Sequence, residues 1–352
     1  MKAKIIGLVI LIVVILSAAV YWRTMTPKNL TVVNGYLGGE KIGLFEDAKF
    51  AEIMAQKGYK VSYSKAGSLD MISADKEGKD YLFPSSQTAL DLYNKQFGKP
   101  MRSEIIFNTP IVLYTWDILA DAMIKDGLVT EEENGILTCD MVKLVSYIEE
   151  NKKWADIGLP QIYGNIAVHT TDPRKSNSGN MFAGLLANAL NGGKVATETD
   201  LPAISERLKA VFDNLGYMES SSGDLFAQFL KTGAGAKPMI AGYESQLLEL
   251  SVEDADTYQK VKEKIKIIYP IPTVWSSHVY IALNEKGRDV IDVLTGPEIQ
   301  QLAWEKHGFR TGIVGSSNPT DIFPVVGLTD DVTTIISMPD SGTMEKIIEL
   351  LQ

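Results

Sequence analysis

The sequence has little of the chemistry that most enzymes need. Among its 352 residues are one cysteine, Cys139, and three histidines, His169, His278 and His307. The histidines are too widely separated for a zinc site, and neither a Gly-x-Ser-x-Gly elbow nor a phosphate-binding Gly-x-x-x-x-Gly-Lys-Ser/Thr loop occurs. The lone cysteine excludes an intrachain disulfide and is expected to be a small buried residue. We therefore expect no enzymatic activity, no metal and no cofactor.

Excess positive charge is also missing. Lysine and arginine number 34 against 44 aspartates and glutamates, which gives a net charge of −10. Nucleic-acid phosphates need concentrated Lys and Arg, so the sequence predicts no nucleic-acid partner. The hydrophobic fraction of 45% is enough to bury a large core, and the length favours two lobes over one. An acidic protein can still bind an anion, because helix ends and a single Arg set the potential inside one cleft.

The N-terminus contains the one long apolar run, residues 5–22, which has no charge and ends with Tyr21-Trp22. The aromatic end suits a membrane interface, and Lys2 and Lys4 favour an N-terminus inside the cell. We expect residues 1–28 to form one uncleaved transmembrane helix, with the remaining chain on the extracytoplasmic side. The alternative is cleavage after small residues near Ser17-Ala18-Ala19, which would release a secreted protein. No cysteine follows the run to accept a lipid.

Strands followed by helices recur after the apolar run. Residues 30–35, 59–63 and 80–84 have strand patterns, and residues 41–57 predict an amphipathic helix. The strands run into small polar residues, namely Asn34-Gly35, Gly67-Ser68 and Ser85-Ser86. Ligands bind at the carboxyl ends of strands in open α/β sheets, so these three junctions are expected to face one crevice. Each junction alone is ordinary turn chemistry.

The middle of the chain predicts a second lobe. Residues 104–116 are too long for a typical strand and contain a proline, which indicates a strand that continues as a crossover. Residues 265–272 have the pattern of a return crossover. The first lobe is therefore expected to comprise residues 29–112 and 274–352, and the second lobe residues 113–273. Further helices are expected at 117–125, 141–152, 201–215, 223–231, 285–294 and 297–306, and further strands at 237–242 and 276–283.

Residues 171–180 are the most informative segment of the chain. A strand at residues 165–169 is expected before it and a helix at residues 181–190 after it, with Ser176 or Asn177 as the cap. The free N–H groups at a helix N-terminus, together with Arg174 and Lys175, would bind an oxyanion or a carboxylate. The competing interpretation is an ordinary capped helix.

These residues resemble the type 2 periplasmic solute-binding proteins, in particular the sulfate, molybdate and tungstate receptors. The resemblance covers roughly residues 30–312, and its most specific parts are residues 171–179, 240–246 and 304–310. It implies an α/β fold of two lobes, joined by two or three hinge crossovers, that closes around a solute. The chain departs from the family's usual form because it keeps an N-terminal helix and lacks a lipid-accepting cysteine.

We therefore expect a monomeric, membrane-tethered protein that captures a small anionic solute for an ABC-type permease. The alternative is a tethered sensor or scaffold that recruits a protein partner through its acidic surface or through residues 317–352. Trp116, Trp275 and Tyr243 leave a sugar site open, although core or hinge positions are expected for them. Glu244 is expected at the surface or paired with Arg174. The predicted ligand-binding residues are Asn34, Gly35, Ser68, Ser85, Ser86, Arg174, Ser176, Asn177, Ser178 and Tyr243.

Overall fold

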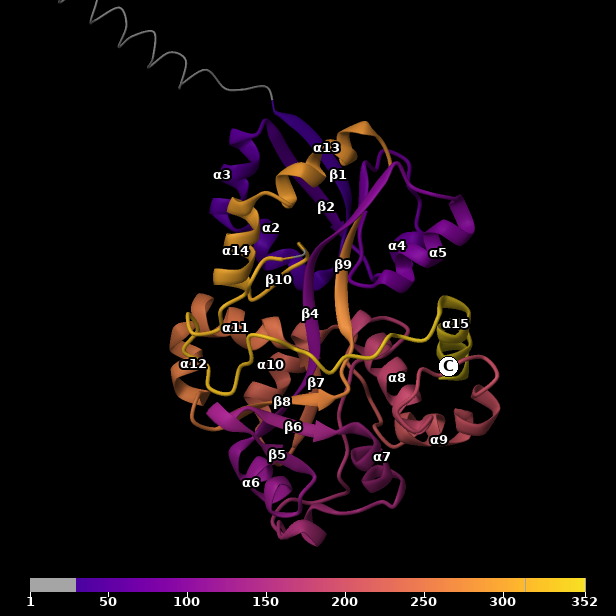
Figure 1. Ribbon diagram of the computed structural model, residues 1–352, viewed down its shortest axis with the longest axis vertical. Coiled ribbons are helices and arrows are strands. Elements are labelled where there is room, and N and C mark those ends of the chain that lie inside the picture. The colour runs from indigo at the N-terminus through magenta and orange to yellow at the C-terminus, as the bar shows by residue number, and fades with distance from the viewer. Residues whose placement is uncertain (1–29, 314, 352) are drawn as a thin grey trace, which may run out of the picture.

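The protein consists of two α/β lobes stacked along the long axis of the molecule (Figure 1). The computed structural model describes residues 30–313 and 315–351. Within these ranges no helix is long and apolar enough to cross a membrane. The predicted anchor at residues 1–28 lies outside the described residues.

The first lobe is built on a mixed sheet with the strand order β2-β1-β3-β9-β4. Three of these strands are β1 (Thr31–Leu37), β2 (Tyr59–Lys65) and β3 (Tyr81–Phe83), which pair in parallel and so direct their carboxyl ends to one edge. Antiparallel β9 (Trp275–Ala282) and the first half of β4 (Arg102–Trp116) complete the sheet, with short β10 (Arg310–Thr311) at its edge. Its helices are η1 (Gly39–Lys41), α2 (Ile42–Glu46), α3 (Ala48–Gln56), α4 (Asp70–Ser73), α5 (Gln87–Phe97), α13 (Glu285–Leu294) and α14 (Pro297–His307).

The second lobe uses the other half of the same long strand. From Ile111 onward β4 pairs with β7 (Met239–Tyr243) and β8 (Ile265–Ile271), and β8 pairs in parallel with β6 (Leu137–Asp140). Strand β5 (Val129–Glu131) closes the edge. The helices of this lobe are α6 (Asp117–Lys125), η2 (Glu133–Gly135), α7 (Met141–Glu149), η3 (Trp154–Ile157), α8 (Asn177–Leu190), α9 (Leu201–Asp213), α10 (Ser222–Thr232), α11 (Glu244–Glu253) and α12 (Ala255–Val261).

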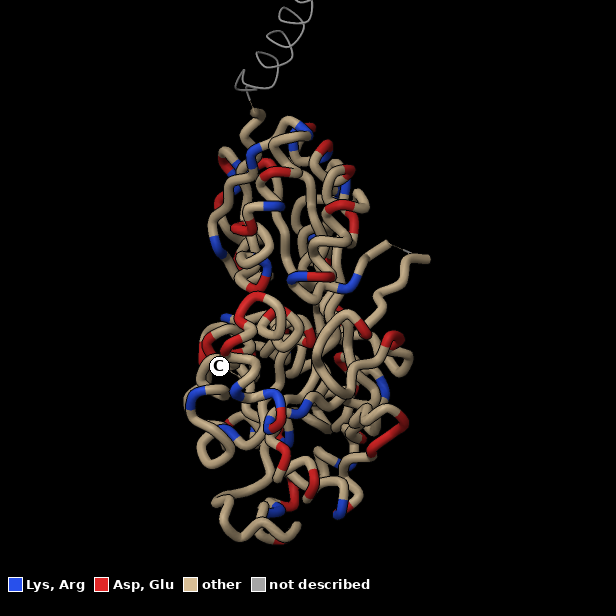
Figure 2. Tube along the Cα trace, turned by 90° about the vertical axis from the view of Figure 1, so that its left-hand side faces the viewer, with Lys and Arg blue, Asp and Glu red and all other residues tan. Residues whose placement is uncertain are grey.

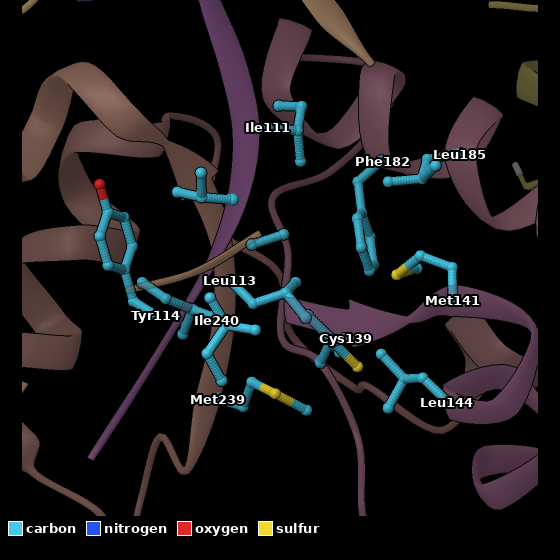
Figure 3. Packing of buried hydrophobic residues seen from close by; sticks show 14 of the residues in the cluster. Ile111, Leu113, Tyr114, Cys139, Met141, Leu144, Phe182, Leu185, Met239 and Ile240 are labelled. Atoms are coloured by element: carbon cyan, nitrogen blue, oxygen red, sulfur yellow. The ribbon is translucent and has the colours of Figure 1, made fainter. Parts of the chain in front are cut away.

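The core of the second lobe surrounds the second half of β4, from Ile111 onward. Ile111 and Leu113 lie beside Phe182 of α8 and Cys139 of β6, and all four side chains are buried (Figure 3). Cys139 is 1% exposed and burial raises the pKa of its thiol to about 12, so it is the small buried residue that the sequence predicted. Helix α8 is buried along most of its length, which fixes the position of its N-terminus rigidly.

The C-terminal segment crosses from the first lobe to the second. After β10 it runs over the hinge in front of β4 and ends in α15 (Ser341–Leu350), which lies beside α8 and α9 (Figure 1). Thr273 of the hinge exchanges backbone hydrogen bonds with it, donating to Thr334 and accepting from Ile336. The sequence assigned residues 274–352 to the first lobe, but the segment after Gly312 packs mainly on the second. Met344 and Ile347 of α15 are buried, so the segment is part of the folded body.

Three local predictions were wrong. Asn34 and Gly35 lie inside β1 rather than at a turn, because Gly35 allows Tyr81 of β3 to approach closely; an added Cβ would lie 2.5 Å from the Tyr81 ring. The helix expected at residues 41–57 is broken at Asp47, whose extended backbone and carboxylate cap α3. Residues 165–169 form only isolated bridges, because their pairing with Lys153 and Ile240 does not extend into a ladder.

Candidate functional site

A cleft of about 630 Å³ separates the two lobes at the carboxyl ends of the parallel strands. The first lobe contributes the segments that follow β1 and β2. The second lobe contributes the residues before α8 and α10 and the junction of β7 with α11. The lining residues are Gly38, Gly39, Glu40, Gly43, Lys65, Ala66, Gly67, Ser68 and Asp70 from the first lobe, and Lys175, Ser176, Asn177, Ser220, Ser221, Ser222, Gly223, Asp224, Tyr243, Ser245, Gln246 and Glu249 from the second.

A buried lysine lies behind the wall that the first lobe presents. Lys41 is fully buried, and its Nζ donates hydrogen bonds to Glu40 Oε1 at 2.5 Å and to Ser85 Oγ at 2.6 Å. Ser85 also contacts the same Glu40 oxygen. Burial lowers the pKa of Lys41, and the neighbouring Glu40 carboxylate counteracts this effect. A buried ammonium is tolerated only when paired and hydrogen-bonded, and Glu40 supplies that pairing.

His278 of β9 is the third partner of Lys41. Its Nδ1 lies 3.2 Å from Lys41 Nζ and accepts from it, which places the ring proton on Nε2. The ring is fully buried and Nε2 has no hydrogen-bond partner among the described residues. Burial, assisted by the Lys41 charge, holds the pKa of His278 well below its ordinary value. His278 is therefore a neutral support that holds the ammonium in place.

The wall of the second lobe presents the N-terminus of α8. Ser176, one of the two predicted caps, occupies the N-cap position, but its side chain makes no capping hydrogen bond and the first turn contains no acidic residue. The Ser176 hydroxyl instead lies 3.1 Å from the Ser178 hydroxyl, which bonds to Thr171 Oγ1 at 2.9 Å. The first N–H groups of α8 consequently lack side-chain acceptors, and the positive end of the helix dipole faces the cleft.

Asn177 joins the two lobes at the back of the cleft. Its side-chain amide donates to the Ser85 carbonyl at 2.9 Å in the first lobe and to the Tyr243 hydroxyl at 3.0 Å in the second. The Ser85 carbonyl also accepts from Ser276 Oγ at 2.7 Å. Tyr243 lines the cleft although it is 1% exposed, and burial raises the pKa of its phenol. Asn177 therefore has protein partners for its amide, and it brings the α8 N-terminus next to Ser85.

Arg174 is occupied by its own loop. Its guanidinium donates to both carboxylate oxygens of Asp172, at 2.8 and 2.6 Å, and does not line the main cleft. The hydrogen bonds from Arg174 lower the pKa of the Asp172 carboxyl. Lys175 is the adjacent cation that does line the cleft, with 64% of its side chain exposed.

The structure brings together only part of the predicted set. Ser68, Ser176, Asn177 and Tyr243 line the cleft, and Ser85 lies directly behind it, where its N–H donates to Ser68 Oγ at 2.9 Å. The remaining predicted residues do not line it. Ser86 caps α5 by accepting from the Thr88 N–H, Ser178 is buried in α8, Arg174 binds Asp172, and Asn34 and Gly35 lie inside β1.

The sequence predicted that Glu244 lies at the surface or pairs with Arg174, and both predictions were wrong. It is fully buried on the hinge side of the molecule, where Arg310 donates to both of its oxygens at 2.6 and 2.8 Å. Tyr269 donates to the same carboxylate at 2.5 Å, and Arg310 also donates to the carbonyls of Thr329 and Asp330. The network joins β10, α11 and the C-terminal segment, so it belongs to the hinge and not to the cleft.

Along the Cα trace, residues of both charges are interspersed in the two lobes and occur where the lobes meet (Figure 2). The cleft lining contains four carboxylates, and three have partners: Glu40 binds Lys41, Asp224 accepts from Ser221 Oγ and Glu249 lies 2.7 Å from His307 Nδ1. The fourth carboxylate is that of Asp70, which has no such partner within the described residues. Among the described residues no group of three or more His, Cys, Asp or Glu is placed to hold a metal ion.

Sequence reasoning missed the residues that follow β1. Gly38, Gly39 and Glu40 form part of the first-lobe wall and Lys41 lies behind it, but the expected strand end at Asn34-Gly35 placed the junction four residues too early. The available signal was the pair of glycines followed by two opposite charges. The segment 220–224 was also missed, although Ser220-Ser221-Ser222-Gly223 precedes a predicted helix in the same way as residues 176–180 do.

Comparisons with solved structures agree with the two-lobe architecture. No family model and no curated protein matches the sequence. The fold is similar to the substrate-binding protein of an ABC transporter from Agrobacterium tumefaciens, with a TM-score of 0.56 and 14% identity over 92% of this chain and 95% of that one. It is also similar to the apo ferric ion-binding protein A of Pasteurella haemolytica, with a TM-score of 0.55 and 14% identity over 91% of this chain and 96% of that one.

The sulfate-binding protein SubI of Mycobacterium tuberculosis is a third neighbour, with a TM-score of 0.50 and 15% identity over 90% of this chain and 98% of that one. Iron- and sulfate-binding proteins are both among the neighbours, so the likeness does not single out the sulfate receptors. At these identities the likeness concerns the fold alone. The chain has the two-lobe α/β fold of periplasmic substrate-binding proteins.

Proposed function

We propose that the protein is an extracytoplasmic solute-binding protein that closes its two lobes around a small anionic solute and delivers it to an ABC-type transporter. The observation that carries the proposal is the cleft of about 630 Å³ formed by loops of both lobes. This volume falls within the range of small-molecule sites. Because β4 runs through both lobes, hinge bending can change the width of the cleft without unfolding either sheet. The neighbours in fold are binding proteins, which favours capture over catalysis.

The anionic character of the solute is supported by two features that face each other. On the second lobe, α8 begins without a side-chain cap and is preceded by Lys175. On the first lobe, Ser68 lines the cleft in front of Ser85 and Lys41. Hydrogen-bond donors and a helix N-terminus together stabilise an oxyanion or a carboxylate. We propose Ser68, Lys175, Ser176 and Tyr243 as ligand contacts because all four line the cleft.

The membrane tether and the sulfate-receptor kinship are further parts of this proposal. The uncharged apolar run at residues 5–22, followed by Arg23, supports a tether that holds the lobes on the extracytoplasmic side. Determination of the mass of the exported protein tests it: an uncleaved chain retains residues 1–28, whereas loss of the residues up to the small-residue site near Ser17-Ala18-Ala19 would indicate a secreted protein.

Calorimetric titration of the full chain with sulfate, phosphate, acetate and succinate tests the function itself. One of these solutes is expected to bind, and Lys175→Gln is expected to weaken its affinity by about two- to fivefold, because ion pairs of exposed side chains contribute less than about 1 kcal/mol. Lys194→Gln is the matched control, because Lys194 is an exposed lysine outside the cleft. If no solute binds while the chain captures a membrane protein stably, the sensor or scaffold alternative replaces this proposal.

A further inference from the structure

The best-formed anion site of the cleft already contains a carboxylate, and it belongs to the protein. Glu40 Oε1 accepts from Lys41 Nζ at 2.5 Å and also contacts Ser85 Oγ. Glu40 lines the cleft, whereas Lys41 is fully buried and Ser85 has no exposed surface. The Glu40 carboxylate therefore stands between the cleft and the buried ammonium.

The space that holds this carboxylate depends on a glycine. A Cβ at Gly38 would lie 2.4 Å from Glu40 Oε1, 2.9 Å from Lys41 Nζ and 3.0 Å from Ser85 Oγ. Any side chain at Gly38 would fill the space beside the two donors. The backbone at this position therefore leaves room for one carboxylate group and little else.

Other groups of the protein hold the two donors, Lys41 and Ser85, in place, whereas the acceptor, Glu40, is held by these donors alone. Lys41 Nζ is held from behind by His278 Nδ1 at 3.2 Å, and Ser85 is held by Ser68 Oγ on its N–H and by Asn177 on its carbonyl. Within the part of the chain that the structure describes, the Glu40 carboxylate makes hydrogen bonds only to Lys41 and Ser85, and it extends from the short helix η1 at the cleft surface. The donors thus form a preorganised site that a second carboxylate can occupy when Glu40 turns outward.

Building on the proposed function, we propose that Glu40 is an internal competitor for the solute and that Lys41 and Ser85 bind the solute's carboxylate when Glu40 leaves. The solute is therefore a carboxylate compound. The ammonium stays paired in both states, so neither state contains the unpaired buried charge that is strongly destabilising. Asn177 places the uncapped end of α8 beside Ser85, so closure brings both anion-binding features onto one group. The apparent affinity for the solute is therefore the intrinsic affinity multiplied by the fraction of molecules in which Glu40 has left the site.

Removal of the competitor tests this inference. Glu40→Ala in the full chain is expected to bind acetate at least about tenfold more tightly than the wild type, because the hydrogen-bonded charge pair is then formed with acetate alone. Its melting temperature is expected to fall in sodium chloride and to recover in sodium acetate of equal ionic strength. Asp70→Ala is the matched control, because it removes one carboxylate from the same cleft wall where no buried ammonium lies behind it. The change in acetate affinity that Asp70→Ala causes measures the general effect of removing a negative charge from the cleft. It should be less than about threefold at moderate salt.

The double variant Glu40→Gln with Lys41→Met removes the charge pair together and is expected to lose the acetate-dependent stabilisation. A folded Glu40→Ala protein whose acetate affinity is unchanged or weaker overturns the inference, as does equal tightening in Asp70→Ala. Stabilisation by sulfate but not by acetate overturns the assignment to carboxylates. If the wild type binds a solute of the panel and Glu40→Ala binds it no better, this inference fails while the proposed function stands. If neither protein binds any solute, both fail.

Discussion

Two buried ion pairs differ in what encloses them: one joins the lobes at the hinge, and the other lies in the first lobe beside the cleft. On the hinge side, the Arg310–Glu244 pair is surrounded by Tyr269 and by the carbonyls of Thr329 and Asp330. On the cleft side, the Lys41–Glu40 pair lies next to a cavity of about 630 Å³, and 10% of the Glu40 side chain is exposed. The ion pair at the hinge is thus enclosed by the protein, whereas the ion pair beside the cleft can exchange its carboxylate for that of a solute.

The charges at the hinge are fully satisfied by the protein. Burial alone would lower the pKa of Arg310, but the Glu244 charge and hydrogen bonds raise it above its ordinary value. Burial, followed by the Glu244 charge, raises the pKa of Tyr269. Arg310 and Tyr269 therefore keep their protons over the physiological range, and their hydrogen bonds hold the C-terminal segment against the hinge.

The largest expected effect comes from breaking the hinge pair. Glu244→Ala leaves the Arg310 guanidinium buried without its partner, and we expect a loss of about 3–5 kcal/mol in the free energy of unfolding, measured with urea. Acetate should not restore this loss, because Glu244 is fully buried and does not line the cleft. Glu253→Ala on the same helix is the control; it removes an exposed ion pair with Lys306 at 3.4 Å and should cost less than about 1 kcal/mol. Rescue by acetate at both ion pairs would remove the distinction between them.

A smaller loss is expected when only a hinge hydrogen bond is removed. Tyr269→Phe deletes the hydroxyl that donates to Glu244 Oε1 at 2.5 Å and leaves the ion pair intact. Hydrogen bonds to charged groups contribute about 1.5–3 kcal/mol, so the melting temperature should fall clearly but by less than in Glu244→Ala. An unchanged melting temperature would show that water replaces the phenol, and the hinge would then be more open than the structure indicates.

His278, which contacts Lys41 of the cleft pair, is expected to make the stability of the protein depend on pH. Burial holds the pKa of His278 well below the value of about 6.5 in an unfolded chain, so the unfolded state binds a proton that the folded state does not. Stability should therefore rise with pH across this window and be lost as pH falls below about 6.5, by about 1.4 kcal/mol per pH unit. His278→Asn, whose amide oxygen can still accept from Lys41, should flatten the urea-derived slope by that amount between pH 6 and 5.

His169 provides a comparison in the second lobe. Burial and the Lys237 charge lower its pKa to about 4, so His169→Asn should flatten the slope over the same interval and lose that effect near pH 4. Equal slopes in the wild type and in both variants would mean that the folded protein protonates these rings.

The smallest expected effect concerns the open end of α8. Ser176 makes no capping hydrogen bond, so Ser176→Ala should change the free energy of unfolding by less than about 0.5 kcal/mol. Ser221→Ala is the matched substitution at α10, where the hydroxyl accepts from the Asp224 N–H at 3.2 Å, and it should cost about 1 kcal/mol. Equal losses in thermal unfolding would indicate that Ser176 caps α8, and its N-terminus would then be less available to an anion.

Local patterns in the sequence predicted the elements well where the signal was local. The helices α6 and α13 and the crossover through Pro110 lie where the patterns placed them, and Ser176, one of two predicted caps, occupies the N-cap position of α8. The failures have non-local causes. Asn34-Gly35 has turn composition, but Gly35 serves the close approach of Tyr81 across the sheet. Glu244 has the composition of a surface helix start, but Arg310 approaches it from a distant part of the chain.

The sequence by itself determined the two-lobe plan and the positions of most strand-to-helix junctions, because hydrophobic periodicity and capping residues act within a few positions. It also placed Ser68 at a crevice, since parallel strands direct their carboxyl ends to one edge of the sheet. Only the tertiary structure decided which buried polar groups meet. Lys41 meets His278 and Arg310 meets Glu244 across 237 and 66 residues, and the packing of the lobes settles such partners. Long-range packing likewise left one carboxylate enclosed and the other beside an open cleft.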